Sequence, residues 1–214
     1  MKLIAPSILS ADFANLGRDI QMINNSDADI FHIDVMDGTF VPNISFGFPV
    51  MVPLKQLATK PLDVHLMIVH PEKYVERFCD AGAWSVGFHL EAVDDPMPIL
   101  QLIRNKGVRT CLTINPDIDV KRLDPYLAEV DMILIMSVFA GFGGQKFIPD
   151  SIEKIRYARK QISERGLNTL IEVDGGVTIE NAAEIFAAGA DILVAGSAVF
   201  NAPDPLDAIR QMKQ

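Results

Sequence analysis

The segment FHIDVMDG, residues 31–38, places an imidazole, a carboxylate and a thioether at alternate positions: His32, Asp34 and Met36. The segment is rich in apolar and β-branched residues, which predicts a strand, and side chains two residues apart on a strand point to the same side. Two other segments repeat this spacing, one with Asp63, His65 and Met67 and the other with Glu172 and Asp174. Imidazoles and carboxylates are common ligands of divalent cations, so this pattern suggests a metal site.

A histidine in a strand is more often a hydrogen-bonded core or rim residue than a metal ligand. In this chain, however, three of the four histidines fall late in predicted strands: His32, His65 and His89. Buried His and Asp side chains without partners cost free energy, and convergence on one cation would remove that cost. We therefore favour a metal site and expect three methionines at strand ends to exclude water above it: Met36, Met67 and Met136.

Short apolar segments alternate with longer amphipathic ones along the chain, separated by Gly, Pro, Asn or Asp. The predicted strands are residues 3–9, 30–36, 61–67, 85–91, 109–115, 132–138, 170–176 and 191–197. The predicted helices are residues 12–25, 48–58, 71–82, 96–106, 120–128, 150–165, 179–188 and 204–213, with Pro71, Asp150 and Asp204 as expected starts. Eight strand–helix units in 214 residues predict an α/β fold, a (β/α)8 TIM barrel, as a single domain over residues 1–214.

Chemistry in such a barrel lies at the carboxyl ends of the strands. Polar residues fall late in six of the predicted strands: Ser7, His32 with Asp34, His65, His89, Asp174 and Ser197. The alternative fold is an open doubly wound sheet, which usually has fewer strands and a G-x-G-x-x-G loop. The sequence GFGG at residues 141–144 does not match that motif, so the barrel is the better prediction.

Glycine-rich segments follow three consecutive predicted strands: GFGGQ at 141–145, DGGV at 174–177 and AGSAVF at 195–200. Any one of them could be only a tight turn between a strand and a helix. Phosphate sites in TIM barrels frequently use the loops after strands seven and eight, where glycines let backbone N–H groups approach the anion. Three such loops at the mouth that carries the predicted metal ligands therefore predict a phosphate site.

The composition narrows the class of partner. The chain is 49% hydrophobic and 22% charged, as is typical of a globular protein. Its net charge is −9 and it has no cluster of Lys and Arg, so we do not expect it to bind nucleic acid or anionic membranes. No apolar run is long enough to span a membrane, and the start MKLIAPSIL lacks the features of a secretory signal, so we expect a cytoplasmic protein. Cys79 and Cys111 are expected to be free, packed thiols.

Six segments together resemble the ribulose-phosphate 3-epimerases, and they run from residue 5 to residue 200: APSILSADFANL, HIDVMDGTFVPNISFG, PLDVHLMI, GFGGQKFIP, EVDGGV and VAGSAVF. The resemblance implies a TIM-barrel isomerase of the pentose phosphate pathway. Such an enzyme interconverts D-ribulose 5-phosphate and D-xylulose 5-phosphate with one divalent cation, which here could be Zn, Fe, Co or Mn. The expected partner is therefore a small phosphorylated ketose.

The resemblance also assigns site residues by position. The implied metal ligands are His32, Asp34, His65 and Asp174, with Asp34 and Asp174 as the acid/base pair. Ser7 and His65 would contact the substrate near the reacting carbons, and Met36, Met67 and Met136 would line the pocket. The phosphate would bind the backbone around Gly143, Gly144, Gly176, Gly196 and Ser197.

Epimerisation at C3 of a ketose phosphate removes a proton beside the carbonyl and returns one to the opposite face, so it needs two acid/base groups on two sides. Asp34 and Asp174 come from predicted strands two and seven, which lie well apart around a barrel. One must start ionised and the other protonated. The cation would stabilise the enediolate that forms between the two proton transfers.

The chain departs from the family pattern in one loop, where MSVFAGFGGQ replaces the usual MSVNPGFGGQ, so Phe139 and Ala140 stand in place of Asn-Pro. Because relatives that act on D-allulose 6-phosphate also vary here, that hexose phosphate is the alternative substrate. A barrel lyase or decarboxylase is disfavoured, because those enzymes carry a lysine where this chain has Met36. A non-catalytic barrel that binds metal and sugar phosphate is the third alternative.

We also expect a homo-oligomer. Candidate interfaces are apolar faces of the barrel helices and the segment PNISFGFPVMVPL, residues 42–54.

Overall fold

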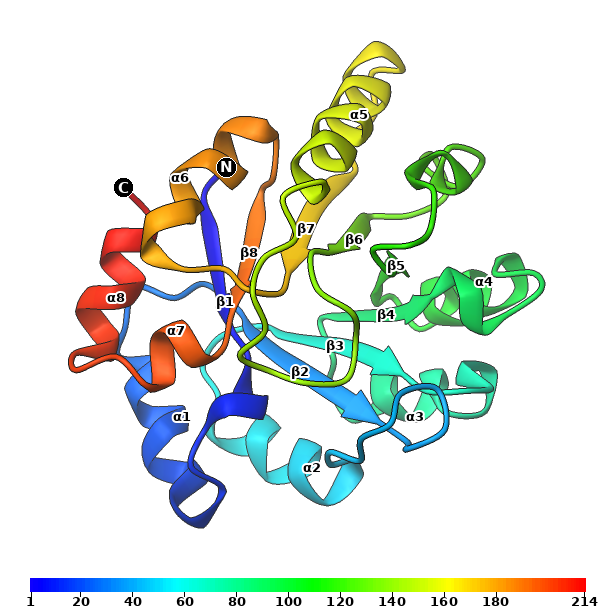
Figure 1. Ribbon diagram of the computed structural model, residues 1–214. Coiled ribbons are helices and arrows are strands. Elements are labelled where there is room, and N and C mark those ends of the chain that lie inside the picture. Colours follow the sequence, from blue (N-terminus) through cyan, green and yellow to red (C-terminus); the bar gives the residue numbers. More distant parts are fainter.

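The computed structural model describes residues 1–214, and its eight strands form one parallel sheet that curls into a barrel (Figure 1). The strands are β1 (Leu3–Pro6), β2 (Phe31–Met36), β3 (Leu62–Met67), β4 (Ser85–His89), β5 (Arg109–Ile114), β6 (Met132–Met136), β7 (Leu170–Asp174) and β8 (Ile192–Ala195). Their order is β1-β8-β7-β6-β5-β4-β3-β2, and a parallel bridge between Ser7 and His32 links the two ends of the sheet. The predicted (β/α)8 TIM-barrel fold is confirmed.

Helices surround the strands (Figure 1). They are α1 (Leu16–Asn24), α2 (Phe48–Leu57), α3 (Val75–Asp80), α4 (Met97–Asn105), α5 (Ser151–Glu164), α6 (Ile179–Ala188), α7 (Ser197–Phe200) and α8 (Pro205–Met212). Asp204 caps α8 by accepting hydrogen bonds from two backbone N–H groups of its first turn, and Asp150 directly precedes α5, as predicted. Pro71 begins a 3-10 turn, Pro71–Lys73, ahead of α3.

The prediction of an α-helix over residues 120–128 is wrong. A 3-10 turn, Val120–Leu123, occupies the start of this segment, and irregular turns follow it. Pro125 lies in the middle of the segment and has no N–H group to donate to the preceding turn. A proline at this point also clashes with the carbonyl of the preceding turn, which disfavours an α-helix over 120–128, although α2 accommodates Pro53.

Several predicted strands run past the observed ends. β1 stops at Pro6, before a 3-10 turn over Ile8–Ser10, and β7 stops at Asp174 because Gly175 and Gly176 both adopt positive φ angles. The strand predicted for 191–197 ends at Ala195, and Ser197 begins the short helix α7 instead. Each correction lies at the carboxyl end of a strand, where the backbone bends away to form the barrel mouth.

The strand side chains divide into two layers by their alternation. In β2, the side chains of Phe31, Ile33 and Val35 pack in the core between the barrel and its helices. A separate apolar cluster inside the barrel contains Met132, Leu134, Ile192 and other residues. The polar residues of β2 are almost fully buried above this cluster, so the fold holds chemically active groups on a closely packed base.

Cys79 and Cys111 are both free and buried, as predicted. None of the helices combines the length and the apolar character that crossing a membrane requires.

Candidate active site

β2 and β3 position three of the four predicted metal ligands. The strands pair with Asp34 opposite His65, so both side chains enter the barrel interior together. Asp34 Oδ1 lies 3.3 Å from His32 Nε2 and 3.1 Å from His65 Nδ1. β7 brings Asp174 from another side of the barrel, with its Oδ2 atom 4.0 Å from each of these ring nitrogens. The four side chains therefore form one cluster.

This cluster fits a divalent cation. One ligand atom from each of the four residues lies within 4.8 Å of the others. His32 Nε2 is buried there without a hydrogen-bond partner, and an unpaired buried nitrogen costs free energy that a bound cation would recover. Two nitrogen and two carboxylate ligands suit Zn, Fe, Co and Mn.

A second layer of buried groups holds the other side of the His32 ring. His32 Nδ1 lies 2.7 Å from Asp63 Oδ2 and 3.6 Å from Glu172 Oε1, and the Ser85 hydroxyl donates to Asp63. Burial alone would lower the pKa of His32, but the surrounding carboxylates, Asp34 foremost, raise that pKa well above its ordinary value. Burial and the nearby charge of Asp63 raise the pKa of Glu172 to about 8. A ring whose Nδ1 faces a carboxylate presents Nε2 to a cation.

The two aspartates lie in different surroundings. Burial opposes ionisation of Asp34, but the neighbouring imidazoles outweigh it and hold the pKa of Asp34 well below its ordinary value. The Ser7 hydroxyl also donates to Asp34 Oδ2 at 2.5 Å. Burial and the charge of Asp34 raise the pKa of Asp174 to about 7. In the absence of a bound cation, Asp34 is thus disposed to be ionised, and Asp174 to carry a proton.

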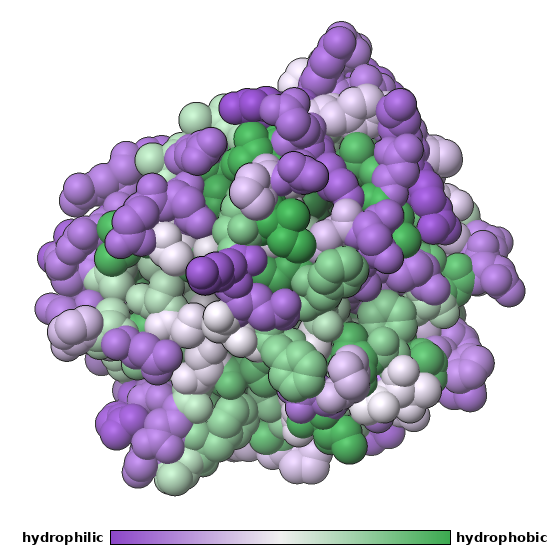
Figure 2. Space-filling view, viewed as in Figure 1, coloured by the Kyte–Doolittle hydropathy of each residue, from purple (hydrophilic) through white to green (hydrophobic).

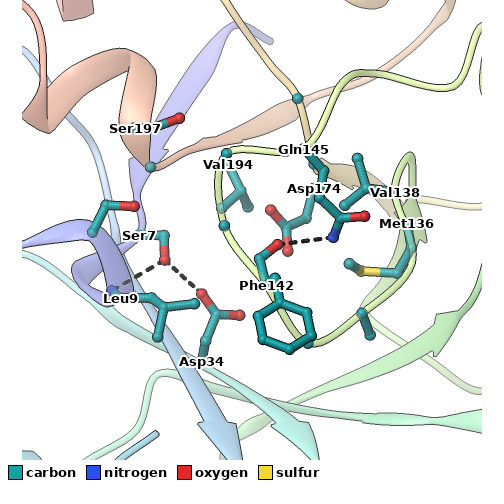
Figure 3. A pocket seen from close by; sticks show the side chains of 18 of the residues that line it. Ser7, Leu9, Asp34, Met136, Val138, Phe142, Gln145, Asp174, Val194 and Ser197 are labelled. Carbon is teal, nitrogen blue, oxygen red and sulfur yellow. Dashed lines mark hydrogen bonds between the residues drawn. The ribbon is translucent and has the colours of Figure 1, made fainter. Parts of the chain in front are cut away.

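Both aspartates line a pocket at the barrel mouth. Figure 3 shows Asp34 and Asp174 pointing into it, with Ser7 beside Asp34 and Met136 beside Asp174. The other predicted substrate-binding residues that line the pocket are Met36, Met67, Gly143, Gly144, Gly176, Gly196 and Ser197. The imidazoles of His32 and His65 lie beneath, at most 1% exposed. The fold therefore places the candidate ligands at the floor and the glycine loops in the wall.

Two glycines in that wall leave little room for a side chain, and at Gly176 the backbone itself requires glycine. A Cβ atom on Gly196 would lie 2.6 Å from Ser10 Oγ, and one on Gly176, whose φ is +64°, would lie 2.3 Å from the backbone nitrogen of Phe147. Gly196 also immediately precedes α7, so the start of this short helix faces the pocket. Loops after strands seven and eight together with a short extra helix form the usual phosphate site of TIM barrels.

The loop between β6 and α5 crosses in front of the barrel mouth (Figure 1). The Gln145 side chain donates to the carbonyl oxygens of Phe139 and Phe142, at 2.7 and 2.9 Å, and so closes the loop on itself. Phe139 and Phe142 are each about half exposed, whereas Ala140 packs beside Met36 and Met67. Hydrophobic side chains gather over this mouth, and hydrophilic ones dominate its rim (Figure 2). Of the two residues that depart from the family pattern, the smaller one packs inward.

Sequence reasoning missed several groups around the site. Leu9, Ser10, Gln145 and Val194 line the pocket but were not predicted to do so. Asp63 and Glu172 were placed on the ligand faces of their strands without a role, and their position two residues before His65 and Asp174 was the available signal. For Leu9 and Val194 no signal existed, because apolar residues at a barrel mouth look like any others.

The fold and site together define a class of enzyme: a TIM barrel with a His/Asp cluster able to hold a metal ion at the floor of a glycine-walled pocket. The chain belongs to the ribulose-phosphate 3-epimerase family, whose model matches residues 3–200, and it is an isomerase of the epimerase class. It is 49% identical to the ribulose-phosphate 3-epimerase of Synechocystis sp. over 97% of this chain and 91% of that protein. It is 46% identical to the Escherichia coli K12 enzyme of the same name, over 99% and 94% of the two chains.

Solved structures share the fold at low sequence identity. KGPDC from Streptococcus mutans superposes with a TM-score of 0.73 at 11% identity, covering 100% of this chain and 96% of that one. The 3-hexulose-6-phosphate synthase of Salmonella typhimurium superposes with a TM-score of 0.70 at 21% identity, covering 100% and 97%. At these identities the likeness concerns the barrel alone.

Proposed function

We propose that this protein is a metal-dependent 3-epimerase that interconverts D-ribulose 5-phosphate and D-xylulose 5-phosphate. The observation that carries the proposal is the placement of Asp34 and Asp174 in one pocket, on strands β2 and β7, which β1 and β8 separate in the barrel. Two carboxyl groups on two sides of a pocket can act on the two faces of one carbon. The names of the relatives support the choice of substrate.

In one direction, Asp34 acts as the base that removes the C3 proton, because the neighbouring imidazoles favour its ionised form. Asp174, on the other side of the pocket, returns a proton to the opposite face of C3. In the reverse direction the two aspartates exchange roles. A bound divalent cation would act as a Lewis acid on the substrate oxygens and favour the enediolate.

The remaining pocket residues would orient the substrate and exclude water from it. Met36, Met67 and Met136 surround the aspartates with apolar, polarisable side chains that limit access of water. At the other end of the pocket, the backbone around Gly196 and Ser197 would hold the phosphate. With this division, C3 would lie between the two carboxyl groups and the phosphate against the loop that follows β8.

The experiment is to incubate the protein, loaded with Co²⁺ or Zn²⁺, with D-ribulose 5-phosphate and separately with D-allulose 6-phosphate, and to follow inversion at C3 by NMR. We expect faster conversion of the pentose phosphate. Preference for the hexose phosphate would assign the alternative substrate, with Ala140 in the loop between β6 and α5 as the first residue to examine. Binding of either sugar without inversion would contradict an epimerase function and leave only the binding barrel.

A further inference from the structure

His89, on β4, is fully buried beside the candidate metal ligands but is not one of them. The centroids of the His89 and His65 rings lie 5.0 Å apart with their planes inclined by 25°, and Phe40 packs on the His89 ring at 4.7 Å. Neither the proposed proton transfers nor the phosphate site uses His89. A fully buried imidazole needs partners for both ring nitrogens, so its two contacts indicate its role.

The first contact joins two imidazoles. His65 Nε2 lies 2.9 Å from His89 Nε2, so one of the two nitrogens carries the hydrogen and the other accepts it. On the opposite edge of the ring, His65 Nδ1 lies among the metal-ligand atoms, 3.1 Å from Asp34 Oδ1. A cation can bind only an unprotonated ring nitrogen. The binding tautomer of His65 therefore carries its hydrogen on Nε2 and donates it to His89.

The second contact sets the tautomer of His89. His89 Nδ1 lies 3.1 Å from Glu91 Oε1, which also accepts the backbone N–H of Asn115 at 2.9 Å. Burial opposes ionisation of Glu91, but the hydrogen bond and the charge of the neighbouring His89, with two backbone N–H groups, outweigh burial and hold the pKa of Glu91 below the ordinary value. A carboxylate requires a hydrogen on the facing nitrogen. The Asn115 side-chain nitrogen lies 3.5 Å from His89 Nδ1, which is too long to compete with the contact to Glu91.

We infer that His89 is a positioning residue. Held by Glu91 with its hydrogen on Nδ1, it presents an unprotonated Nε2 to His65 and fixes the His65 tautomer whose Nδ1 can bind a cation. The inference rests on the proposed metal site and extends it to two residues that lie outside both the ligand set and the pocket. The same series of hydrogen bonds continues to the loop between β6 and α5, because the Asn115 side-chain oxygen accepts the backbone N–H of Ala140 at 3.1 Å.

The direct test needs no substitution. In the protein loaded with Zn²⁺ and labelled with ¹⁵N at histidine, the nitrogen shifts report which ring atom carries hydrogen. We expect His65 to be protonated at Nε2 and His89 at Nδ1. A His89 ring with hydrogen on Nε2 would overturn the inference, because it could not accept from His65.

A binding measurement with Co²⁺ alone tests the consequence. His89→Leu, which cannot accept a hydrogen bond, should weaken Co²⁺ binding about 10- to 100-fold and shift the visible absorption of the bound ion, while His89→Gln should restore part of the affinity. His70→Asn, at an exposed histidine that is not among the candidate ligands, is the control. Unchanged Co²⁺ affinity and spectrum in a folded His89→Leu variant would overturn the inference. A wild-type protein that binds no divalent cation would contradict the proposed function as well.

Discussion

At the scale of single residues, Asp34 and Asp174 show how surroundings differentiate two identical side chains. Asp34 contacts both imidazoles and the Ser7 hydroxyl, whereas Asp174 reaches the imidazoles only at 4.0 Å and faces the charge of Asp34. Their pKa values therefore move in opposite directions. A pair of carboxyl groups in opposite protonation states is what proton transfer to two faces of one carbon requires.

Replacing either aspartate should remove most of the activity. We expect Asp34→Asn and Asp174→Asn each to lower kcat by about 10²- to 10⁴-fold, the usual contribution of a positioned acid or base. The measurement is the steady-state rate of ribulose 5-phosphate conversion at saturating cation. Asp94→Asn, at an exposed carboxylate, is the control and should retain the wild-type rate. Near-normal turnover in either active-site variant would contradict the two-carboxylate mechanism.

The buried Glu172 should make the metal-free protein less stable as pH rises. Its pKa is about 8 in the folded protein and 4.5 ordinarily, so between these values the folded state binds more protons than the unfolded state. The free energy of unfolding then falls with rising pH, by up to about 1.4 kcal/mol per pH unit for one group. The raised pKa of His32 also lowers the free energy of unfolding as pH rises above 6.5. His65, with a pKa of about 4 in the folded protein, is neutral in both states above pH 6.5 and does not contribute.

We therefore expect the Tm of the metal-free protein to fall between pH 6.5 and 8, and Glu172→Gln to reduce that slope. Thermal unfolding followed by circular dichroism in the presence of a chelator provides the measurement. Glu184→Gln, at an exposed position, should keep the wild-type slope. An identical slope in Glu172→Gln would show that Glu172 does not hold its extra proton in the folded state.

At the scale of elements, the barrel strands explain which residues could be predicted. Alternation in β2, β3 and β7 fixes which side chains enter the barrel, so His32, Asp34, His65 and Asp174 were predictable as a group from their spacing. The helix α7 could not be predicted, because a four-residue helix directly after a strand is too short to show a helical periodicity. The link from His89 through Glu91 to Asn115 was also beyond the sequence, since it depends on how the segment that ends β4 meets the residue that follows β5.

The segment before α7 leads to a prediction about substrate binding. Gly196→Ala would place a Cβ atom against the Ser10 hydroxyl and so displace a side chain that lines the pocket where the phosphate is proposed to lie. Loss of one hydrogen bond to a charged group costs about 1.5–3 kcal/mol, so we expect KM to rise roughly 10- to 150-fold with a smaller change in kcat. Gly17→Ala in α1 makes the same chemical change where no atom lies within 4 Å, and it should leave KM unchanged. A wild-type KM in Gly196→Ala would place the phosphate elsewhere.

At the scale of the whole molecule, a cation bound by the four ligands would join β2, β3 and β7. A ligand that binds only the folded state stabilises it by about 2.7 kcal/mol at 100 times its Kd. For a chain of this size we expect Co²⁺ or Zn²⁺ to raise Tm by about 5–10 °C at that concentration. His32→Asn should abolish the response, and His70→Asn should keep it. A Tm that does not respond to either metal would contradict the site.

The central claim is that the two aspartates exchange a C3 proton with solvent on opposite faces. The most direct measurement is conversion of D-ribulose 5-phosphate by the metal-loaded wild-type protein in D2O, with deuterium at C3 of the product followed by NMR. We predict that D-xylulose 5-phosphate forms with deuterium at C3, because the proton returned by Asp174 comes from solvent. Product that keeps its original hydrogen at C3, or the absence of both inversion and exchange, would contradict the account.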